Sequence, residues 1–223
     1  MANQFIVSVK EIIPRTHNVH TFRVTKPDNF SFTPGQATDL SLNEEGWKEN
    51  KHPFTFTCLP DDDYLEFTIK LYDNPEGLTN KLKSIKKGAE FEISEAWGAI
   101  EYKGEGVFIA GGAGVTPFIS IFRHLRSKEE IGNNVLFFSN KTEQDIILKD
   151  EFEEILGKNF INVITNQADT DYYNKRIDKS FLQQEIKNFN QQFYVCGPDE
   201  FTKSILDALK DLGADVNTLV FEK

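Results

Sequence analysis

Three glycines between an apolar segment and a helix-like segment give the clearest chemical signal in the sequence. They belong to the run Ile-Ala-Gly-Gly-Ala-Gly-Val-Thr-Pro at residues 109–117. Glycines let the backbone approach a ligand closely, and the N–H groups that begin a helix have no partner within it. Thr116 can cap this helix, and Pro117 suits its first turn. The run predicts a site for a dinucleotide pyrophosphate, although a tight strand–helix turn would use the same residues.

A second candidate lies far along the chain, where Cys196 ends an apolar segment and Gly197 and Pro198 follow. Open parallel sheets bind ligands at the carboxyl ends of their strands. We therefore expect Cys196 and Gly111 to lie at the same edge of one sheet. The alternative is a structural cysteine, because a buried thiol often serves as a small core residue.

A third candidate is the segment Lys-His-Pro-Phe-Thr-Phe-Thr at residues 51–57. Its cationic pair, Lys51 and His52, could bind a phosphate. Phe54 offers a flat ring and Thr55 a hydroxyl, which suit the face and a nitrogen of a ring system. Taken alone, a strand of Phe and Thr is more often part of a protein core.

The cysteine and histidine content excludes several kinds of redox and metal site. The chain has only two cysteines, so neither a disulfide framework nor an iron–sulfur cluster held by four thiolates is expected. His17 and His20 have no third ligand nearby, which argues against zinc. Any redox chemistry must therefore use an organic cofactor.

The charge pattern limits the partners and the location. The formal net charge is −10, and both halves of the chain are acidic, so we expect no nucleic-acid partner. The lysines between residues 81 and 87 form a local basic cluster, which is more typical of a solvated helix face than of a docking patch. No apolar run approaches the roughly 20 residues that span a bilayer, and the N-terminus lacks a signal-peptide pattern. The sequence thus predicts a cytoplasmic protein without a membrane span.

The first half of the chain reads as a small antiparallel β-barrel. Its β-branched and aromatic residues gather in short runs between turns rich in Pro, Gly and Asp. In the run Leu-Glu-Phe-Thr-Ile-Lys-Leu at residues 65–71, the apolar residues fall on odd numbers, the alternation of a half-buried strand. One helix is predicted near residues 78–85. The predicted strands are 5–9, 19–24, 38–42, 54–57, 65–72 and 91–94.

After residue 104 the pattern changes to alternating strands and helices. The predicted strands are 107–110, 135–138, 161–164 and 193–196, and the predicted helices are 117–125, 148–156, 179–189 and 200–212. This alternation is typical of a parallel sheet with helices on both faces. We find no repeat and no low-complexity linker, so the connection at residues 99–105 is expected to be short and packed.

In this order and on these elements, the motifs resemble those of the ferredoxin–NADP⁺ reductase superfamily over nearly the whole chain. His-Pro-Phe-Thr at residues 52–55 resembles the flavin signature Arg-x-Tyr-Ser/Thr, with the usual Pro-Gly-Gln upstream at 34–36. Gly-Leu-Thr-Asn at 77–80 resembles its Gly-x-x-Ser/Thr pyrophosphate turn, and Glu-Ala-Trp-Gly at 95–98 its Gly-Pro-x-Gly turn. Residues 111–117 match its Gly-Gly-x-Gly-x-Thr-Pro, and residues 196–198 its Cys-Gly-Pro.

The resemblance implies an FAD-binding β-barrel domain at residues 1–102 and an NAD(P)-binding α/β domain at residues 103–223. Phe54 would cover one flavin face, and Thr55 would hydrogen-bond near the N5 atom that accepts hydride. Cys196 would lie against the nicotinamide, and Glu222 would join Thr55 and Cys196 as the catalytic group. The implied cofactor-binding residues are His52, Pro53, Phe54, Thr55, Ile69, Lys70, Leu71, Gly77, Leu78, Thr79, Gly111, Gly112, Ala113, Gly114, Val115, Thr116, Cys196, Gly197 and Pro198.

Two basic residues bear on the choice between NADH and NADPH. Lys141 and Arg176 stand where relatives bind the 2′-phosphate of NADPH, whereas Thr165 and Asn166 replace a usual Ser-Arg pair. We therefore expect both dinucleotides to serve, with less than about tenfold discrimination, or about 1.4 kcal/mol.

The sequence departs from the superfamily pattern at three places. His52 replaces an arginine, so Lys51 must supply the missing charge or FAD binds more weakly. Phe54 replaces a tyrosine, which keeps the stacking surface and loses a hydroxyl. Phe221 stands two positions before the aromatic residue that caps the flavin in relatives, so no ring of this chain is expected on that face.

The resemblance implies an FAD-dependent NAD(P)H oxidoreductase that passes electrons to a separate acceptor, such as flavodoxin, ferredoxin or a small molecule. A simple Rossmann dehydrogenase is a poor match, because the G-x-G-x-x-G order and its acidic residue are absent. The alternatives are a free-flavin reductase, a redox-silent sensor of FAD and dinucleotide, and an electron-transfer subunit of a larger complex.

Overall fold

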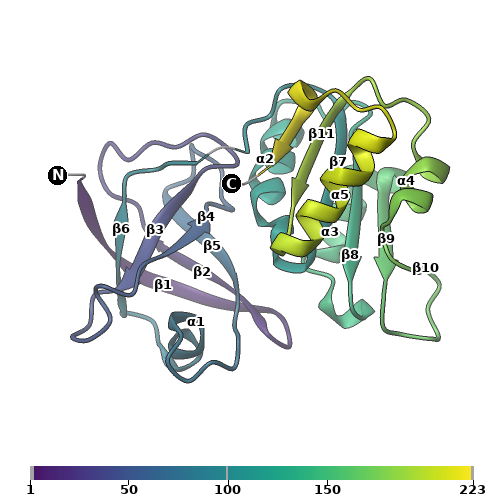
Figure 1. Ribbon diagram of the computed structural model, residues 1–223. Helices are drawn as coiled ribbons and strands as arrows, with labels where there is room; N and C mark the ends of the chain where they lie inside the picture. Colours follow the sequence, from purple (N-terminus) through teal and green to yellow (C-terminus); the bar gives the residue numbers. More distant parts are fainter. Residues whose placement is uncertain (1–2, 99, 222–223) are drawn as a thin grey trace.

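The computed structural model describes residues 3–98 and 100–221, in which two six-stranded sheets lie side by side (Figure 1). The first sheet is antiparallel and has the order β4-β3-β6-β1-β2-β5. Its strands are β1 (Gln4–Thr16), β2 (Val19–Thr25), β3 (Ala37–Leu42), β4 (His52–Thr55), β5 (Tyr64–Lys70) and β6 (Glu90–Ser94).

The antiparallel sheet closes into the expected barrel. Its two outer strands meet through a bridge between Phe56 and Phe67, and the N–H of Thr57 donates to the carbonyl of Glu66 at 2.8 Å. Phe22, Phe56, Phe67 and Phe91 are fully buried inside. Phe22 and Phe91 meet edge-on with centroids 6.0 Å apart, and the rings of Phe56 and Phe67 are tilted with centroids 5.3 Å apart. The barrel therefore offers a rigid platform for a site on its rim.

The predicted helix near residues 78–85 is present as two short pieces. A single α-helical turn, α1 (Leu78–Lys81), runs into a 3₁₀ turn at Leu82–Ser84. Leu78 and Leu82 are buried in the barrel core, which explains the helical spacing of the apolar residues. The segment closes one end of the barrel (Figure 1).

The second half forms the expected parallel sheet with helices on both faces, in the order β10-β9-β8-β7-β11-β12. Its strands are β7 (Gly106–Gly111), β8 (Val135–Asn140), β9 (Phe160–Ile164), β10 (Tyr173–Asn174), β11 (Gln192–Cys196) and β12 (Leu219–Phe221). Its helices are α2 (Thr116–Ser127), α3 (Lys149–Leu156), α4 (Lys179–Glu185) and α5 (Asp199–Asp211). One core lies between the sheet and α2–α3, the other between the sheet and α4–α5. No helix in the described ranges is long and apolar enough to cross a membrane.

The connection between the two halves is pinned by Tyr194 of β11. Its hydroxyl donates to the carbonyl of Gly104 and accepts from the N–H of Lys103, both at 2.8 Å. Its ring stacks on Phe108 with centroids 4.2 Å apart. Burial raises the pKa of Tyr194 to about 12, so the hydroxyl keeps its proton. The last barrel strand ends at Ser94 and β7 begins at Gly106, whereas a boundary at residue 102 stays a prediction.

Candidate functional site

A cavity of about 910 Å³ lies where the rim of the barrel meets the carboxyl edge of the parallel sheet. Its size is at the upper end of the usual range for small-molecule sites, about 300–1,000 Å³. From the barrel, the predicted site residues that line it are Pro53, Phe54, Thr55, Ile69, Lys70 and Thr79. From the α/β half they are Gly111, Ala113, Gly114, Thr116, Cys196, Gly197 and Pro198. Segments that are far apart in the sequence thus share one cavity.

The barrel wall is built from side chains on β4 and β5. Thr55 pairs with Ala37 of β3, which fixes the last residue of β4 in the sheet. The half-buried ring of Phe54 packs against the barrel core, so it offers a flat and rigid face to the cavity. Ile69 and Lys70 end β5 on the same wall. This combination suits a planar ring system with polar edges.

The opposite wall is built from backbone. The turn after β7 passes through a 3₁₀ segment, Gly112–Val115, into α2, and the turn after β11 lies directly against it. A Cβ on Gly114 would lie 2.4 Å from the carbonyl oxygen of Cys196, and one on Gly197 would lie 3.2 Å from the Cα of Gly111. These glycines are required because the two turns touch. Helix N-termini commonly bind phosphates, and Ala113, Gly114 and Thr116 at the start of α2 line the cavity.

The two walls fit an FAD and a nicotinamide dinucleotide respectively. The barrel wall presents an aromatic face and hydroxyls, and on the opposite wall Gly111 and Gly114 bring backbone without side chains to the cavity, as phosphate-binding turns do. When bound, the flavin supplies the redox chemistry, while the chain binds and orients both molecules.

Two protein families match this chain over adjoining regions. Residues 4–116 match a family described as an FAD-binding domain, and residues 108–207 match one described as an oxidoreductase NAD-binding domain. The first match alone spans half of the chain. The chain belongs to the ferredoxin–NADP⁺ reductase superfamily. The first matched region covers the barrel and runs on through β7 into the glycine turn, and the second, which overlaps it at residues 108–116, covers most of the parallel-sheet half.

Relatives of this superfamily member are reductases of several kinds. It is 27% identical to an NADH-cytochrome b5 reductase 2 of Mycosarcoma maydis, with 91% of this chain and 64% of the relative covered. It is also 27% identical to the reductase component of a propane 2-monooxygenase of Mycolicibacterium smegmatis, with 89% and 61% covered. This chain thus spans about three fifths of the length of these two relatives.

Solved structures share the fold over the full length of this chain. A ferredoxin NADP⁺ reductase of Neisseria gonorrhoeae with bound FAD and NADP superposes with a TM-score of 0.87 at 20% identity, covering 100% of this chain and 99% of that one. The flavohem-like FAD/NAD-binding domain of a nitric oxide dioxygenase of Vibrio cholerae gives 0.86 at 18% identity, covering 100% and 98%. The fold is therefore that of this superfamily.

The cations predicted for the flavin phosphates are directed elsewhere in this superfamily member. Nε2 of His52 lies 2.8 Å from Oδ1 of Asn50, and His52 does not line the cavity. Lys51 pairs with Glu92 at 3.1 Å and does not line the cavity either. On the barrel wall, the cationic side chain that lines the cavity is Lys70.

Several predicted site residues stand outside the lining of the cavity. The side chains of Leu71, Leu78 and Val115 are buried in the domain cores, as apolar residues within a binding turn often are. Gly77 and Gly112 belong to the predicted turns and do not line the cavity. Lys141 and Arg176 are exposed on the α/β half, also away from the lining. Glu222 lies outside the described residues, and its catalytic role stays a prediction.

Sequence reasoning missed the contribution of α5 and of two exposed aromatic residues. Lys203, Leu206 and Lys210 line the cavity, at the i, i+3 and i+7 spacing of one helix face. Tyr72 and Trp97 also line it, and Trp97 is 41% exposed. The spacing on α5 was a usable signal, because this helix starts directly after the Cys-Gly-Pro turn.

One ring of the C-terminal segment reaches the cavity, whereas the expectation that no ring caps the flavin face stays a prediction. Phe221 pairs in register with Val195, one residue before Cys196, and it lines the cavity. Phe221 also lines a second cavity of about 390 Å³, which shares Thr55 and Trp97 with the first. The parallel pairing of β12 with β11 brings the ring of Phe221 to this edge of the sheet.

Proposed function

We propose that this chain binds FAD, accepts hydride from NADH or NADPH, and passes electrons to a separate acceptor. The observation that carries the proposal is the common cavity in which Thr55, expected at the flavin, and Cys196, expected at the nicotinamide, both line the wall. Donor and acceptor held in one cavity react as if at very high local concentration. The acceptor is expected to be a second molecule, for which the names of the relatives suggest a haem protein or an oxygenase component.

A strongly acidic acceptor is disfavoured by the surface charges. The overall charge is −10, and in the basic cluster Lys81 pairs with Glu44 at 2.8 Å while Lys83 pairs with Asp73. Complementary charge normally speeds association, and these pairs neutralise part of the only basic patch noted in the sequence. A flavodoxin or ferredoxin acceptor would therefore need a contact other than this patch.

A free-flavin reductase is the second candidate, and the cations of β4 favour it. Neither His52, which bonds Asn50, nor Lys51, which pairs with Glu92, lines the cavity, so we expect FAD to exchange more readily than in relatives with arginine. Purification separates the two candidates. Protein that retains FAD through gel filtration supports the resident cofactor, whereas protein that needs added flavin for turnover supports the alternative.

Steady-state kinetics with both dinucleotides tests the nucleotide expectation. We expect kcat/KM for NADH and NADPH to differ by less than about tenfold, or about 1.4 kcal/mol. The motivation is that Lys141 and Arg176 are exposed and can approach a 2′-phosphate, whereas Thr165 and Asn166 bring no charge. A thousandfold preference for either dinucleotide would contradict this mixed assignment.

A further inference from the structure

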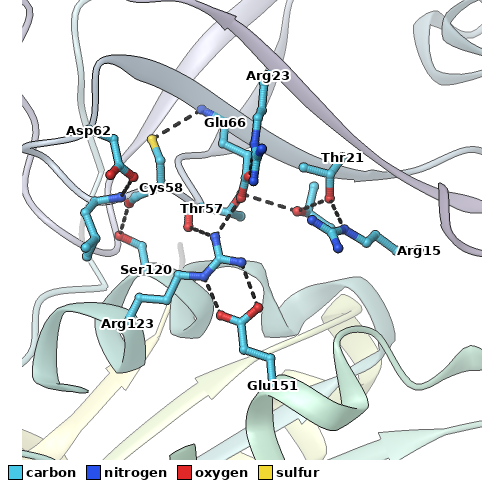
Figure 2. Close-up of polar contacts among 12 residues, drawn as sticks. Arg15, Thr21, Arg23, Thr57, Cys58, Asp62, Glu66, Ser120, Arg123 and Glu151 are labelled. Carbon is cyan, nitrogen blue, oxygen red and sulfur yellow. Dashed lines mark hydrogen bonds and ion pairs between the residues drawn. The ribbon is translucent and has the colours of Figure 1, made fainter. Parts of the chain in front are cut away.

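A buried polar network joins the two halves beside the cavity (Figure 2). At its centre, Arg123 of α2 donates through Nη1 to Oε1 of Glu66 on β5 and to the carbonyl of Thr57, both at 2.6 Å. Its Nε and Nη2 donate to the two carboxylate oxygens of Glu151 on α3, at 2.5 and 2.8 Å. Glu66 also accepts from Nε of Arg23 at 3.0 Å and from the hydroxyl of Thr57 at 2.9 Å.

One face of α2 makes all of these contacts with the barrel and also reaches the cavity. Thr116, Ser120 and Arg123 are spaced by four and three residues, so they lie along the same side of the helix. Thr116 lines the cavity, the hydroxyl of Ser120 donates to the carbonyl of Cys58 at 3.0 Å, and Arg123 binds Thr57.

The barrel side has the same arrangement. Thr55 lines the cavity at the end of β4, and the carbonyls of Thr57 and Cys58, two and three residues later, accept the bonds from α2. The predicted dinucleotide turn and the predicted flavin strand are therefore joined a few residues behind the point where each meets its ligand.

The energetics of the network favour a role in orientation rather than in stability. Glu66 is 0% exposed, and burial alone would raise its pKa, but the charge of Arg123 and hydrogen bonds from Arg123, Arg23 and Thr57 lower it overall. Burial alone would lower the pKa of Arg123, but its carboxylate partners raise it. Buried ion pairs often add little stability over apolar residues of the same size. The planar fork of a guanidinium nevertheless permits only one geometry with its partners.

We propose that Arg123 and Glu66 are positioning residues for hydride transfer, which fix the face of α2 against residues 55–58 and so set the gap between the two bound nucleotides. The inference deepens the proposed function and depends on it, because the gap matters only if both nucleotides react in this cavity. A displacement of about 1 Å at reacting atoms can cost roughly a hundredfold in rate. The other interdomain ion pair of the described residues, His17 with Asp145 at 3.8 Å, is too long and too exposed to fix this geometry.

The test replaces the central pair without changing the net charge. Glu66→Gln combined with Arg123→Met removes the bonds of Arg123 to the barrel and leaves the one from Ser120. The remaining partners, Arg23 and Glu151, are 33% and 27% exposed and can be hydrated. The matched control is Arg126→Met with Glu154→Gln, which breaks another pair between α2 and α3 on the solvent side.

In stopped-flow measurements with FAD-loaded protein, we expect the rate of flavin reduction at saturating NADH to fall at least tenfold in the double variant, with a KM close to that of the parent. The control should stay within twofold. Arg123→Lys keeps the charge and loses the fork, so we expect an intermediate loss of at least threefold. Should the double variant fail to fold, the lysine variant decides: a parent-like rate overturns the proposal.

A second measurement needs neither nucleotide nor turnover. Spin labels on Glu45→Cys of the barrel and Lys187→Cys of the α/β half report the distance between the halves, and the two native cysteines are buried. We expect one narrow distance distribution in the parent and the control, and a broadened or shifted one in the double variant. An unchanged distribution, or flavin reduction at the parent rate, would overturn the inference. A parent that itself fails to reduce flavin would instead refute the proposed function.

Discussion

The two walls of the cavity are made in different ways. The barrel wall uses side chains, such as Phe54, Thr55 and Lys70, whereas the opposite wall uses backbone turns that touch only because Gly114 and Gly197 lack a Cβ. The glycine turn keeps the superfamily pattern residue for residue, and the barrel strand departs from it at His52 and Phe54. A wall made of touching backbone turns tolerates few substitutions. A wall made of side chains can change its binding properties through single substitutions.

The largest effect is expected on the backbone wall, at Gly114. In Gly114→Ala the new Cβ would lie 2.4 Å from the carbonyl oxygen of Cys196, so the two turns must separate. We expect kcat/KM for NADH to fall roughly a hundredfold or more, since reacting groups tolerate little displacement. Gly112→Ala is the matched control in the same turn: its φ of +52° costs about 1–2 kcal/mol, but the added Cβ meets no atom within 4 Å. Equal losses in both variants would contradict the assignment.

On the side-chain wall, Phe54→Ala should weaken FAD binding and leave the barrel folded. The ring is half-buried against the core, and loss of a stacked aromatic ring costs about 1–3 kcal/mol. Titration of apoprotein with FAD should therefore show a Kd that rises about five- to 150-fold. Phe54→Tyr, which restores the residue of relatives, should bind like the parent. If Phe54→Ala bound FAD with unchanged affinity, Phe54 would not belong to the flavin site.

The stability that Glu66 contributes at the contact between the two halves should depend on pH. Its pKa is lowered in the folded protein from an ordinary value of 4.5, so its contribution to stability is present above pH 4.5 and is lost as the pH falls below it. At pH 6 we expect Glu66→Gln to be less stable than the parent by about 1–3 kcal/mol. The difference should shrink as the pH falls below 4.5, because the carboxyl of the unfolded parent then binds a proton more readily than the folded one. Urea unfolding at several pH values checks this, and a pH-independent difference would contradict it.

The smallest effect is expected where the barrel wall departs from the pattern. His52→Arg restores a permanent charge beside the expected FAD phosphates, at a position where the imidazole now bonds Asn50. We expect a gain in FAD affinity of about 1 kcal/mol, or roughly fivefold, because the site is exposed. His52→Gln should bind FAD like the parent. If His52→Arg did not raise the affinity for FAD, the FAD phosphates would lie away from this strand.

The sequence predicted what local patterns determine. Alternating Val, Ile and Phe residues predicted the strands of the barrel, and the change to strand–helix alternation after residue 104 predicted the parallel sheet. The glycines that line the cavity were also found, because contact between backbones leaves no other residue type. The two-residue strand β10 and the three-residue strand β12 were too short to give a periodic signal.

Contacts between the halves could not be predicted. Apolar residues on odd numbers in residues 65–71 indicated a half-buried strand, yet both faces of β5 are buried, because α2 docks on the side of Glu66 and Thr68. Arg123 falls within the predicted helix 117–125, and nothing in the local sequence distinguishes it from a solvated surface residue. The ion pair of Lys51 could not be predicted for the same reason, since its partner Glu92 comes from a distant strand.

Anaerobic reduction tests the central claim most directly. Protein loaded with FAD is mixed with NADH, and in parallel with NADPH, while the absorbance of the oxidised flavin is followed. We expect one equivalent of either dinucleotide to bleach one equivalent of bound flavin, and admission of an electron acceptor to restore the colour. Bound FAD that keeps its absorbance with both dinucleotides would contradict the account and support a redox-silent sensor.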